Sequence, residues 1–165
     1  MIRKVFLYAV MAIIPLVSCK TSEASKAQST KGTADQQKMI NGPWILDTVT
    51  YEGNEGKFSS VLFNDADATC FENSEWYFRN NNNTGSYILA SSDNCSGGER
   101  FIRWSILGTG QLQFKSIDSK YKDTSGGLGY RFDIASLETS QMVLKSRVSV
   151  DGEPITIVYS FTKNQ

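Results

Sequence analysis

The chain has 165 residues, a length that suits one domain once an N-terminal targeting segment is set aside. Hydrophobic residues make up 40% of it and aromatic residues 12%, while 17 basic and 17 acidic residues give a net charge of zero. This balance does not indicate a phosphate-binding surface, and we expect no nucleic-acid partner. The chain has no histidine, which excludes the Ser-His-Asp and Cys-His nucleophile systems and any histidine-ligated metal site.

The N-terminal segment has the pattern of a secretory signal peptide. Arg3 and Lys4 form a charged beginning, and Val5–Val17 is apolar apart from Tyr8 and Pro15. This apolar run is too short to cross a bilayer comfortably, which favours a signal over a membrane-spanning helix.

The signal ends in Leu16-Val17-Ser18-Cys19, which resembles the lipobox of bacterial lipoproteins. In that family the cysteine is acylated after the signal is cut before it. The resemblance implies a signal peptide over residues 1–18 and lipid attachment at Cys19. The exported protein would then be anchored to a bacterial membrane, which we expect to be the outer membrane, on its periplasmic or surface face. Several acyl chains, at ~0.8 kcal/mol per buried CH₂, give stable anchoring. The alternative is an ordinary cleaved signal in which Cys19 is incidental.

The segment after the cysteine, residues 19–38, is predicted to be a flexible linker. Lys20–Lys38 is rich in Ser, Thr, Lys and Gln, and its only apolar side chains are alanines. Such a segment cannot bury enough apolar surface to offset the entropy of ordering. Random-coil scaling gives it a reach of roughly 25 Å. The alternative is a short exposed helix through Ala34–Met39.

Residues 39–165 are predicted to form one all-β domain, because several segments alternate with a period of two between turn residues. The eight predicted strands are Trp44–Glu52, Glu75–Arg79, Gly85–Ala90, Arg100–Leu107, Gln111–Ile117, Leu128–Leu137, Gln141–Val148 and Pro154–Thr162. A long irregular excursion, Lys57–Ser74, separates the first two. A meander of eight antiparallel strands must hide its two edges, so we predict a closed up-and-down barrel, with a sandwich as the alternative fold.

Gly42-Pro43-Trp44 at the head of an eight-strand meander resembles the lipocalin superfamily, in which a Gly-x-Trp opens the first strand and the Trp closes the barrel floor. The match to bacterial lipocalin-like lipoproteins covers about residues 39–165. It rests on Gly42–Leu46, Leu62–Phe71, Ser74–Asn80, Gly85–Tyr87 and Ile102–Trp104. The resemblance implies that Gly42 and Trp44 form a barrel floor. Typical members also have a Thr-Asp-Tyr-like motif, which Asp118–Tyr121 matches in part. They also have a late arginine stacked on the Trp, for which Arg147 and Lys163 are the candidates.

The remaining two cysteines are predicted to pair. With Cys19 acylated, Cys70 and Cys95 are left in an oxidising, exported context. The closed loop has about 25 residues, so loop entropy gives roughly 3.5 kcal/mol of stabilisation. The alternative is two free thiols.

Alternating carboxylates in the excursion permit a Ca²⁺ interpretation, since Asn64-Asp65-Ala66-Asp67 resembles the start of an EF-hand loop. The loop glycine and the closing Glu are absent at the required spacing, so we favour Asx turns and expect no metal. Asp65 and Asp67, with Glu72 and Glu75, could serve as an acid–base pair only in a geometry that the sequence does not specify. We expect no enzymatic activity and no cofactor.

Aromatic residues on the strands admit two interpretations. The first is a cavity for an apolar or flat ligand. Its lining candidates are Trp76, Phe78, Tyr87, Trp104, Phe114, Tyr130, Phe132 and Tyr159. The second is that the rings fill the barrel, since eight strands leave little room. We favour a membrane-anchored protein that binds a small hydrophobic ligand in the cell envelope. A filled barrel that acts through its loops is the alternative.

Overall fold

The computed structural model describes residues 33–53, 60–150 and 152–164. The predicted signal peptide, Cys19 and residues 20–32 of the predicted linker lie outside this part. A helix over residues 33–40 precedes the strands. The further elements are β1 (Gly42–Glu52), β2 (Val61–Leu62), β3 (Ala66–Asp67), the 3₁₀ helix η1 (Ala68–Phe71), β4 (Ser74–Arg79), β5 (Thr84–Leu89), β6 (Gly98–Ile106), β7 (Leu112–Ile117), β8 (Tyr130–Leu137), β9 (Gln141–Val150) and β10 (Glu153–Lys163). No helix in the described ranges is long and apolar enough to cross a membrane.

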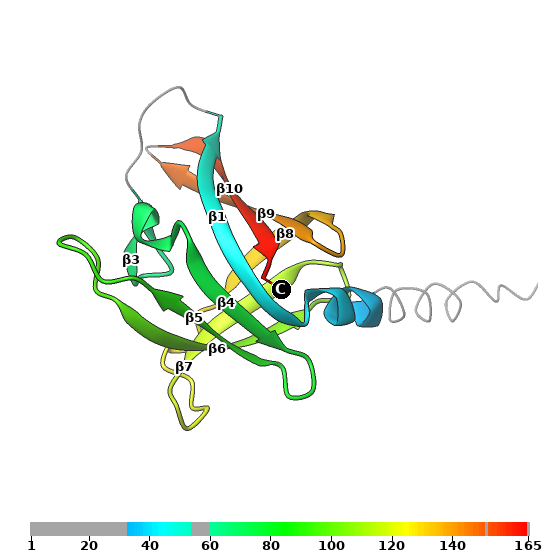
Figure 1. The fold of residues 1–165 in the computed structure, drawn as a ribbon. Coiled ribbons are helices and arrows are strands. Elements are labelled where there is room, and N and C mark those ends of the chain that lie inside the picture. The colour runs from blue at the N-terminus through cyan, green and yellow to red at the C-terminus, as the bar shows by residue number, and fades with distance from the viewer. Residues whose placement is uncertain (1–32, 54–59, 151, 165) are drawn as a thin grey trace, which may run out of the picture.

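Eight of the strands form a closed antiparallel barrel in the order β1-β10-β9-β8-β7-β6-β5-β4 (Figure 1). Consecutive strands pair from β4 to β10, and β1 closes the barrel by pairing with both β10 and β4. This confirms the predicted fold, and each predicted strand overlaps an observed one. Closure leaves no unpaired edge on the main sheet.

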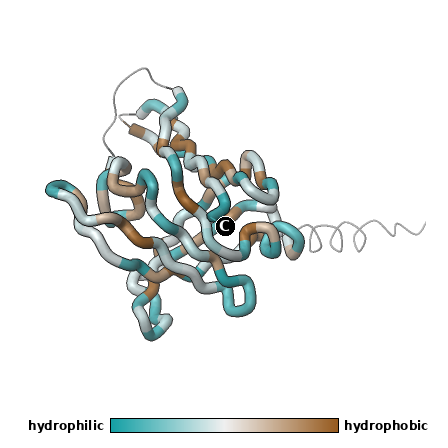
Figure 2. Tube along the Cα trace, viewed as in Figure 1, coloured by the Kyte–Doolittle hydropathy of each residue, from teal (hydrophilic) through white to brown (hydrophobic). Residues whose placement is uncertain are grey.

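The alternation that predicted the strands places their apolar side chains inside the barrel. In β4 the pattern is strictly buried–exposed, with Ser74, Trp76 and Phe78 inside. The β4–β5 turn is hydrophilic in Figure 2, and Asn83 in it has a φ of 56°, the left-handed region that asparagine tolerates.

The helix over residues 33–40 corrects part of the linker prediction. It covers the end of the segment that we expected to be flexible, and the short-helix alternative holds there. The reason is non-local, because Ile40 is fully buried in the barrel core and ties the helix to it. The backbone N–H of Asn41 donates to the Gln37 carbonyl and completes the last turn.

The seam between β7 and β8 is the shortest in the barrel. Only Leu112–Phe114 and Tyr130–Phe132 pair across it. The connecting loop, residues 118–129, projects at the bottom of Figure 1, and a single bridge between Ile117 and Asp123 returns part of it to β7. The outer surface of the barrel is therefore indented beside this seam.

Candidate ligand-binding site at the barrel mouth

One end of the barrel is closed by Trp44, near the start of β1. Its side chain is fully buried, and its indole N–H donates to the Ile40 carbonyl at 2.7 Å. Gly42 has a φ of +109°, a backbone conformation that disfavours any residue with a Cβ. The Gly-x-Trp spacing thus turns the chain out of the helix and places the indole beneath the barrel.

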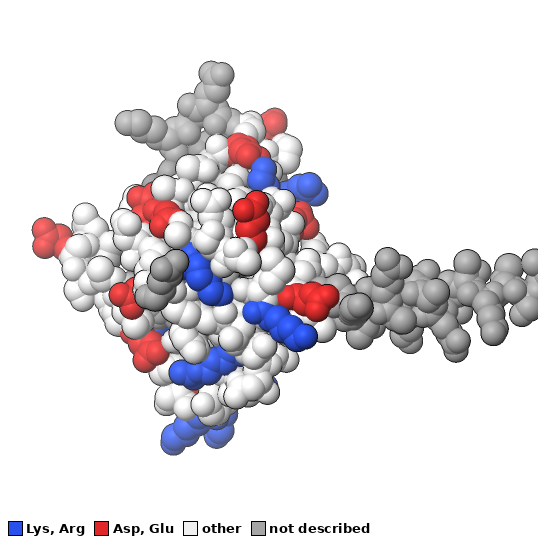
Figure 3. Space-filling model, turned by 45° about the vertical axis from the view of Figure 1, so that its right-hand side comes forward, with Lys and Arg blue, Asp and Glu red and all other residues white. Residues whose placement is uncertain are grey.

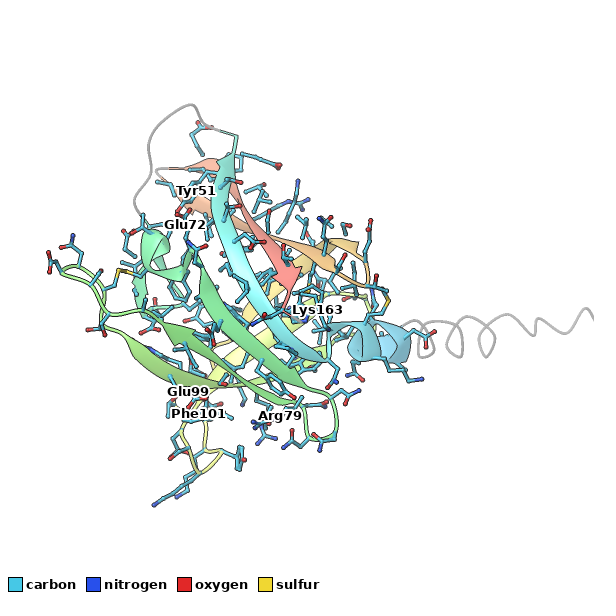
Figure 4. All side chains as sticks on the ribbon, in the orientation of Figure 1. Tyr51, Glu72, Arg79, Glu99, Phe101 and Lys163 are labelled. Atoms are coloured by element: carbon cyan, nitrogen blue, oxygen red, sulfur yellow. A yellow bond between two sulfur atoms is a disulfide. The ribbon has the colours of Figure 1, made fainter. Side chains whose placement is uncertain are left out.

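Lys163, at the end of β10, stacks on this tryptophan. Its ammonium lies 4.3 Å from the centre of the Trp44 ring and donates to the carbonyls of Met39 and Asn41. Burial lowers the pKa of the Lys163 amine. Figure 4 shows Lys163 where β10 ends beside the helix. Of the two late basic candidates, the structure places Lys163 on the tryptophan, while Arg147 lies on β9 near the opposite end.

The opposite end of the barrel, which we term the mouth, lies where β1 ends and is covered by the excursion between β1 and β4. The disulfide between Cys70 in η1 and Cys95 in the β5–β6 loop, predicted from the sequence, is confirmed. The carboxylate of Asp67 caps η1 by accepting from the backbone N–H and hydroxyl of Thr69. The Asx-turn interpretation is therefore correct for Asp67.

A turn between β2 and β3 inserts Phe63 into the mouth. The Asp65 N–H donates to the Leu62 carbonyl at 2.9 Å, and both Phe63 and Asn64 lie in the left-handed region, with φ of 56° and 52°. Asparagine adopts this region readily, but a bulky aromatic residue rarely does. Such a backbone conformation persists only where the surrounding structure holds it, and residues of this kind cluster at functional sites.

Aromatic rings surround the Phe63 side chain, which is only 9% exposed. Its ring centre lies 4.9 Å from that of Phe114, 5.1 Å from that of Tyr130 and 5.9 Å from that of Tyr159. Phe71, Trp76 and Phe132 complete the set. Five of these six rings are on barrel strands, so Phe63 occupies interior space at the mouth.

An ion pair holds the turn that carries Phe63. Both oxygens of Asp65 accept from the Arg100 guanidinium, at 3.0 Å at the closest, and the Tyr87 hydroxyl donates to Asp65 at 2.8 Å. We term these three residues the latch. Burial, and then the hydrogen bond to Asp65, raise the pKa of Tyr87 far above its ordinary value of 10.0. Tyr87 therefore stays a neutral donor. Arg100 pairs with Asp65, so this carboxylate has a structural partner.

Two open pockets flank Phe63, and both are bounded by Phe63, Asn64 and Tyr130. The first has a volume of about 450 Å³ and extends past Tyr87 and Arg100 toward the β7–β8 loop. The second, of about 400 Å³, extends past Phe132 and Tyr159 toward β9 and β10. Each volume lies within the range of small-ligand sites. Phe63 is the partition between them.

The predicted lining residues separate into two groups. Tyr87, Tyr130, Phe132 and Tyr159 border the two mouth pockets. Trp76 and Phe114 lie deeper and contact Phe63 from below, whereas Phe78 and Trp104 pack on each other near the Trp44 end, with ring centres 5.3 Å apart. The Trp104 indole N–H donates to the carbonyls of Arg79 and Thr84. All except Tyr130 are buried.

Sequence reasoning missed Phe63 as a site residue. It lies outside the alternating strands, in a polar stretch that we interpreted as surface turns. The sequence feature that could have identified it is the apolar pair Leu62-Phe63 directly before the turn residues Asn64-Asp65. A large apolar side chain next to a turn sequence is consistent with insertion into a neighbouring cavity.

In a comparison with protein families, the family described as "Lipocalin-like domain" matches residues 40–144. The chain belongs to this lipocalin-like family. A comparison with curated protein sequences finds no match. Among solved structures, bovine odorant-binding protein in complex with a selenium-containing odorant is similar over 78% of this chain and 73% of its own, with 14% identity and a TM-score of 0.46. Lobster apocrustacyanin A1 is similar over 84% of this chain and 68% of its own, with 9% identity and a TM-score of 0.47.

Proposed function

We propose that this lipocalin-like protein binds a small hydrophobic ligand at the barrel mouth, in the space that Phe63 now occupies. The observation that carries the proposal is the placement of Phe63. Its strained backbone directs a ring between two pockets and into an aromatic interior. If the ring moves out, the two pockets and the vacated space form one cavity lined by aromatic side chains.

The latch fits this role because it is polar and lies at the edge of the mouth. The side chains of Asp65 and Arg100 are 22% and 23% exposed, so water reaches the ion pair. Partly exposed ion pairs contribute little stability and exchange easily with solvent. The turn can therefore open without disrupting the barrel, whose strands are paired independently of it.

A direct test is binding of the lipophilic fluorescent probe N-phenyl-1-naphthylamine to the full chain carrying Cys19→Ser, which is expected to lack the acyl anchor. If a ligand binds only a minor open state, its apparent affinity is reduced in proportion to the fraction of the protein in that state. Phe63→Ala should therefore tighten probe binding by about tenfold or more. Asp65→Asn weakens the latch and leaves the core intact, so it should tighten binding by a smaller factor.

Val150→Ala is the matched control, since this side chain on β9 is 38% exposed and borders neither of the two mouth pockets. It should bind the probe like the parent chain. Phe63→Ala should lower the urea midpoint, because it removes a buried ring. If Phe63→Ala and Asp65→Asn both remain folded in the absence of urea and bind the probe no better than the parent chain, the ligand-binding proposal is wrong.

The filled-barrel alternative rests on a specific observation as well. Trp76, Phe78, Trp104 and Phe114 are all at most 3% exposed, so the deep interior is occupied by the chain's own side chains. In that case the protein would act through its loops on a protein partner. Native mass spectrometry of the protein from its own host discriminates between the two: a co-purifying small molecule supports ligand binding, and a co-purifying protein without one supports the alternative.

The proposal includes anchoring to a bacterial membrane through acylated Cys19, in the cell envelope. It rests on the order of basic pair, apolar run and lipobox-like end in residues 1–19. Cys19→Ser should release the protein from membranes or block its processing, as measured by fractionation and by incorporation of labelled palmitate. A Ser variant that matures and fractionates like the parent would contradict the anchor. We assign the protein a binding role and no catalytic one.

A further inference from the structure

The outer face of the barrel beside the β7–β8 seam carries a groove that meets the second mouth pocket at Gly129 and Arg131. Its volume is about 510 Å³. The side chains that line it come from the β4–β5 turn and from the outward positions of three adjacent strands. They are Asn82, Asn83, Arg103, Ser105, Gln113, Lys115 and Arg131. Gly127 and Gly129 of the β7–β8 loop form the rest of the wall, so backbone groups are accessible there.

Basic side chains are concentrated in this groove although the chain as a whole is neutral. Arg103 on β6 and Lys115 on β7 are direct cross-strand partners, and like charges in that position destabilise a sheet. Arg131 is on the next strand, opposite Gln113. Figure 3 shows further basic residues at the lowest projection of the molecule, which is the β7–β8 loop in Figure 1 and is distinct from these strand positions. Three cations on neighbouring strands thus face one indentation.

The nearby carboxylates leave part of this charge uncompensated. Asp123 pairs with Lys115, and this hydrogen bond lowers the pKa of the Asp123 carboxyl. Asp118 accepts backbone N–H groups of its own loop, and Asp133 accepts from the Gln111 amide. Within the described residues Arg131 has no acidic partner, and Arg103 reaches only the Tyr121 carbonyl, at 3.4 Å. Two guanidinium groups therefore remain able to bind an anion.

The uncharged polar side chains of the groove can bind hydroxyl groups of a ligand in addition to its anionic group. Asn82, Asn83, Ser105 and Gln113 offer amide and hydroxyl groups, and the Gln113 amide donates to Ser105 at 3.0 Å. Trp104 and Phe114 also border the groove, but they are only 1% and 3% exposed, so the accessible lining is mainly polar. A guanidinium binds carboxylate or phosphate in a bidentate manner, and carboxamides suit hydroxyl groups.

We infer that this groove is a second binding site, for a small hydroxylated anion: a sugar ring that carries a phosphate or a carboxylate. Arg103 and Arg131 bind the anionic group, and the carboxamides with Ser105 bind the hydroxyls. The site differs in chemistry from the aromatic mouth, because its polar side chains point outward from β6, β7 and β8; the two sites meet only at Gly129 and Arg131.

The test is isothermal titration of the full-length protein in mild detergent with glucose 6-phosphate, glucuronate, glucose and inorganic phosphate. One of the two sugar anions should bind with 1:1 stoichiometry, at least tenfold more tightly than glucose and more tightly than inorganic phosphate. Arg131→Gln and Arg103→Gln should each weaken it by about tenfold or more. Both side chains are exposed, so the variants should fold, and thermal unfolding without ligand verifies this.

Lys38→Gln is the matched control, since it removes one positive charge at an exposed position of the helix over residues 33–40 and does not border the groove. It should leave the affinity unchanged. Failure of both sugar anions to bind would overturn the inference. An equal loss of affinity in Lys38→Gln and Arg131→Gln, or equal binding of inorganic phosphate and the sugar anions, would also overturn it, because each would indicate attraction by net charge alone.

Discussion

The two ends of the barrel are closed by aromatic side chains in physically different ways. Trp44 is fully buried, comes from a barrel strand and is held by a backbone hydrogen bond and the Lys163 ammonium. Phe63 comes from a turn outside the barrel, has a left-handed backbone and is held by an ion pair that water reaches. The comparison teaches that the Trp44 end is closed by the barrel itself, whereas the Phe63 end is closed by a turn outside the barrel, which is the end that we propose to open. The predictions below test this difference.

The largest expected effect is at the Trp44 end. Trp44→Ala removes a fully buried indole and should lower the free energy of unfolding by ~3–5 kcal/mol, as for other large core aromatics. Urea denaturation followed by circular dichroism measures it. Ile88→Ala is the control, because this side chain is 43% exposed and its truncation should change stability by less than about 0.5 kcal/mol. An unchanged midpoint in Trp44→Ala would show that the indole does not close the barrel.

The second effect concerns the disulfide that joins η1 to the β5–β6 loop at the mouth. Removing the Cys70–Cys95 crosslink with paired Cys→Ser substitutions should cost roughly 3.5 kcal/mol, from the entropy of a loop with a sequence separation of 25 residues. Adding reductant to the parent chain should give the same loss. Non-reducing peptide mapping checks the crosslink itself, and recovery of both residues as free thiols from an oxidising compartment would contradict it. If the crosslink orders the Phe63 turn, the double variant should also bind the lipophilic probe more readily.

The strands could be predicted from the sequence because burial follows a local rule. In Gln111–Lys115 every second residue is apolar, and Leu112 and Phe114 are inside as expected. The disulfide was predictable from cysteine count and compartment. The Gly-x-Trp spacing similarly indicated the turn into β1, since it depends on only three residues.

Features that depend on distant partners could not be predicted. Ile40 ends a helix that follows a segment of disordered composition, and contacts with the barrel hold this end: the buried Ile40 side chain and hydrogen bonds from Trp44 and Lys163. Phe63 points inward because five rings on barrel strands surround it and because Arg100 and Tyr87, both distant in the sequence, hold Asp65 of its turn. The net charge of zero gave no indication of the groove, since Arg103, Lys115 and Arg131 meet only when β6, β7 and β8 pair.

A loss of stability of about 1.4 kcal/mol per pH unit for each buried tyrosine is expected at alkaline pH, chiefly at the mouth. Burial raises the pKa of Tyr159 from 10.0 to about 12 and raises that of Tyr87 further. A phenol whose folded pKa exceeds its unfolded value stabilises the fold fully below pH 10 and loses this contribution as pH rises toward the folded pKa. Stability should therefore fall above pH 10, by about 1.4 kcal/mol per pH unit for each tyrosine. Tyr159→Phe should reduce that slope in urea titrations between pH 10 and 12, while Tyr77→Phe, at a 40% exposed position, should not.

The smallest effect separates the two contributions to the Trp44 closure. Lys163→Gln removes the cation over the indole, an interaction worth about 0.5–1 kcal/mol at partly exposed sites. Burial already opposes the charged amine, as its lowered pKa shows, so the net loss of stability should be about 1 kcal/mol or less. Lys163→Arg keeps the charge and should be closer to the parent chain. Urea denaturation of both variants and of Trp44→Ala measures how much of the stability of this closure comes from the Lys163 cation and how much from the buried indole. If Lys163→Gln costs as much as Trp44→Ala, the closure depends on the cation as much as on apolar burial. In that case both ends of the barrel would depend on a charged side chain for closure, and they would differ only in how strongly they depend on it.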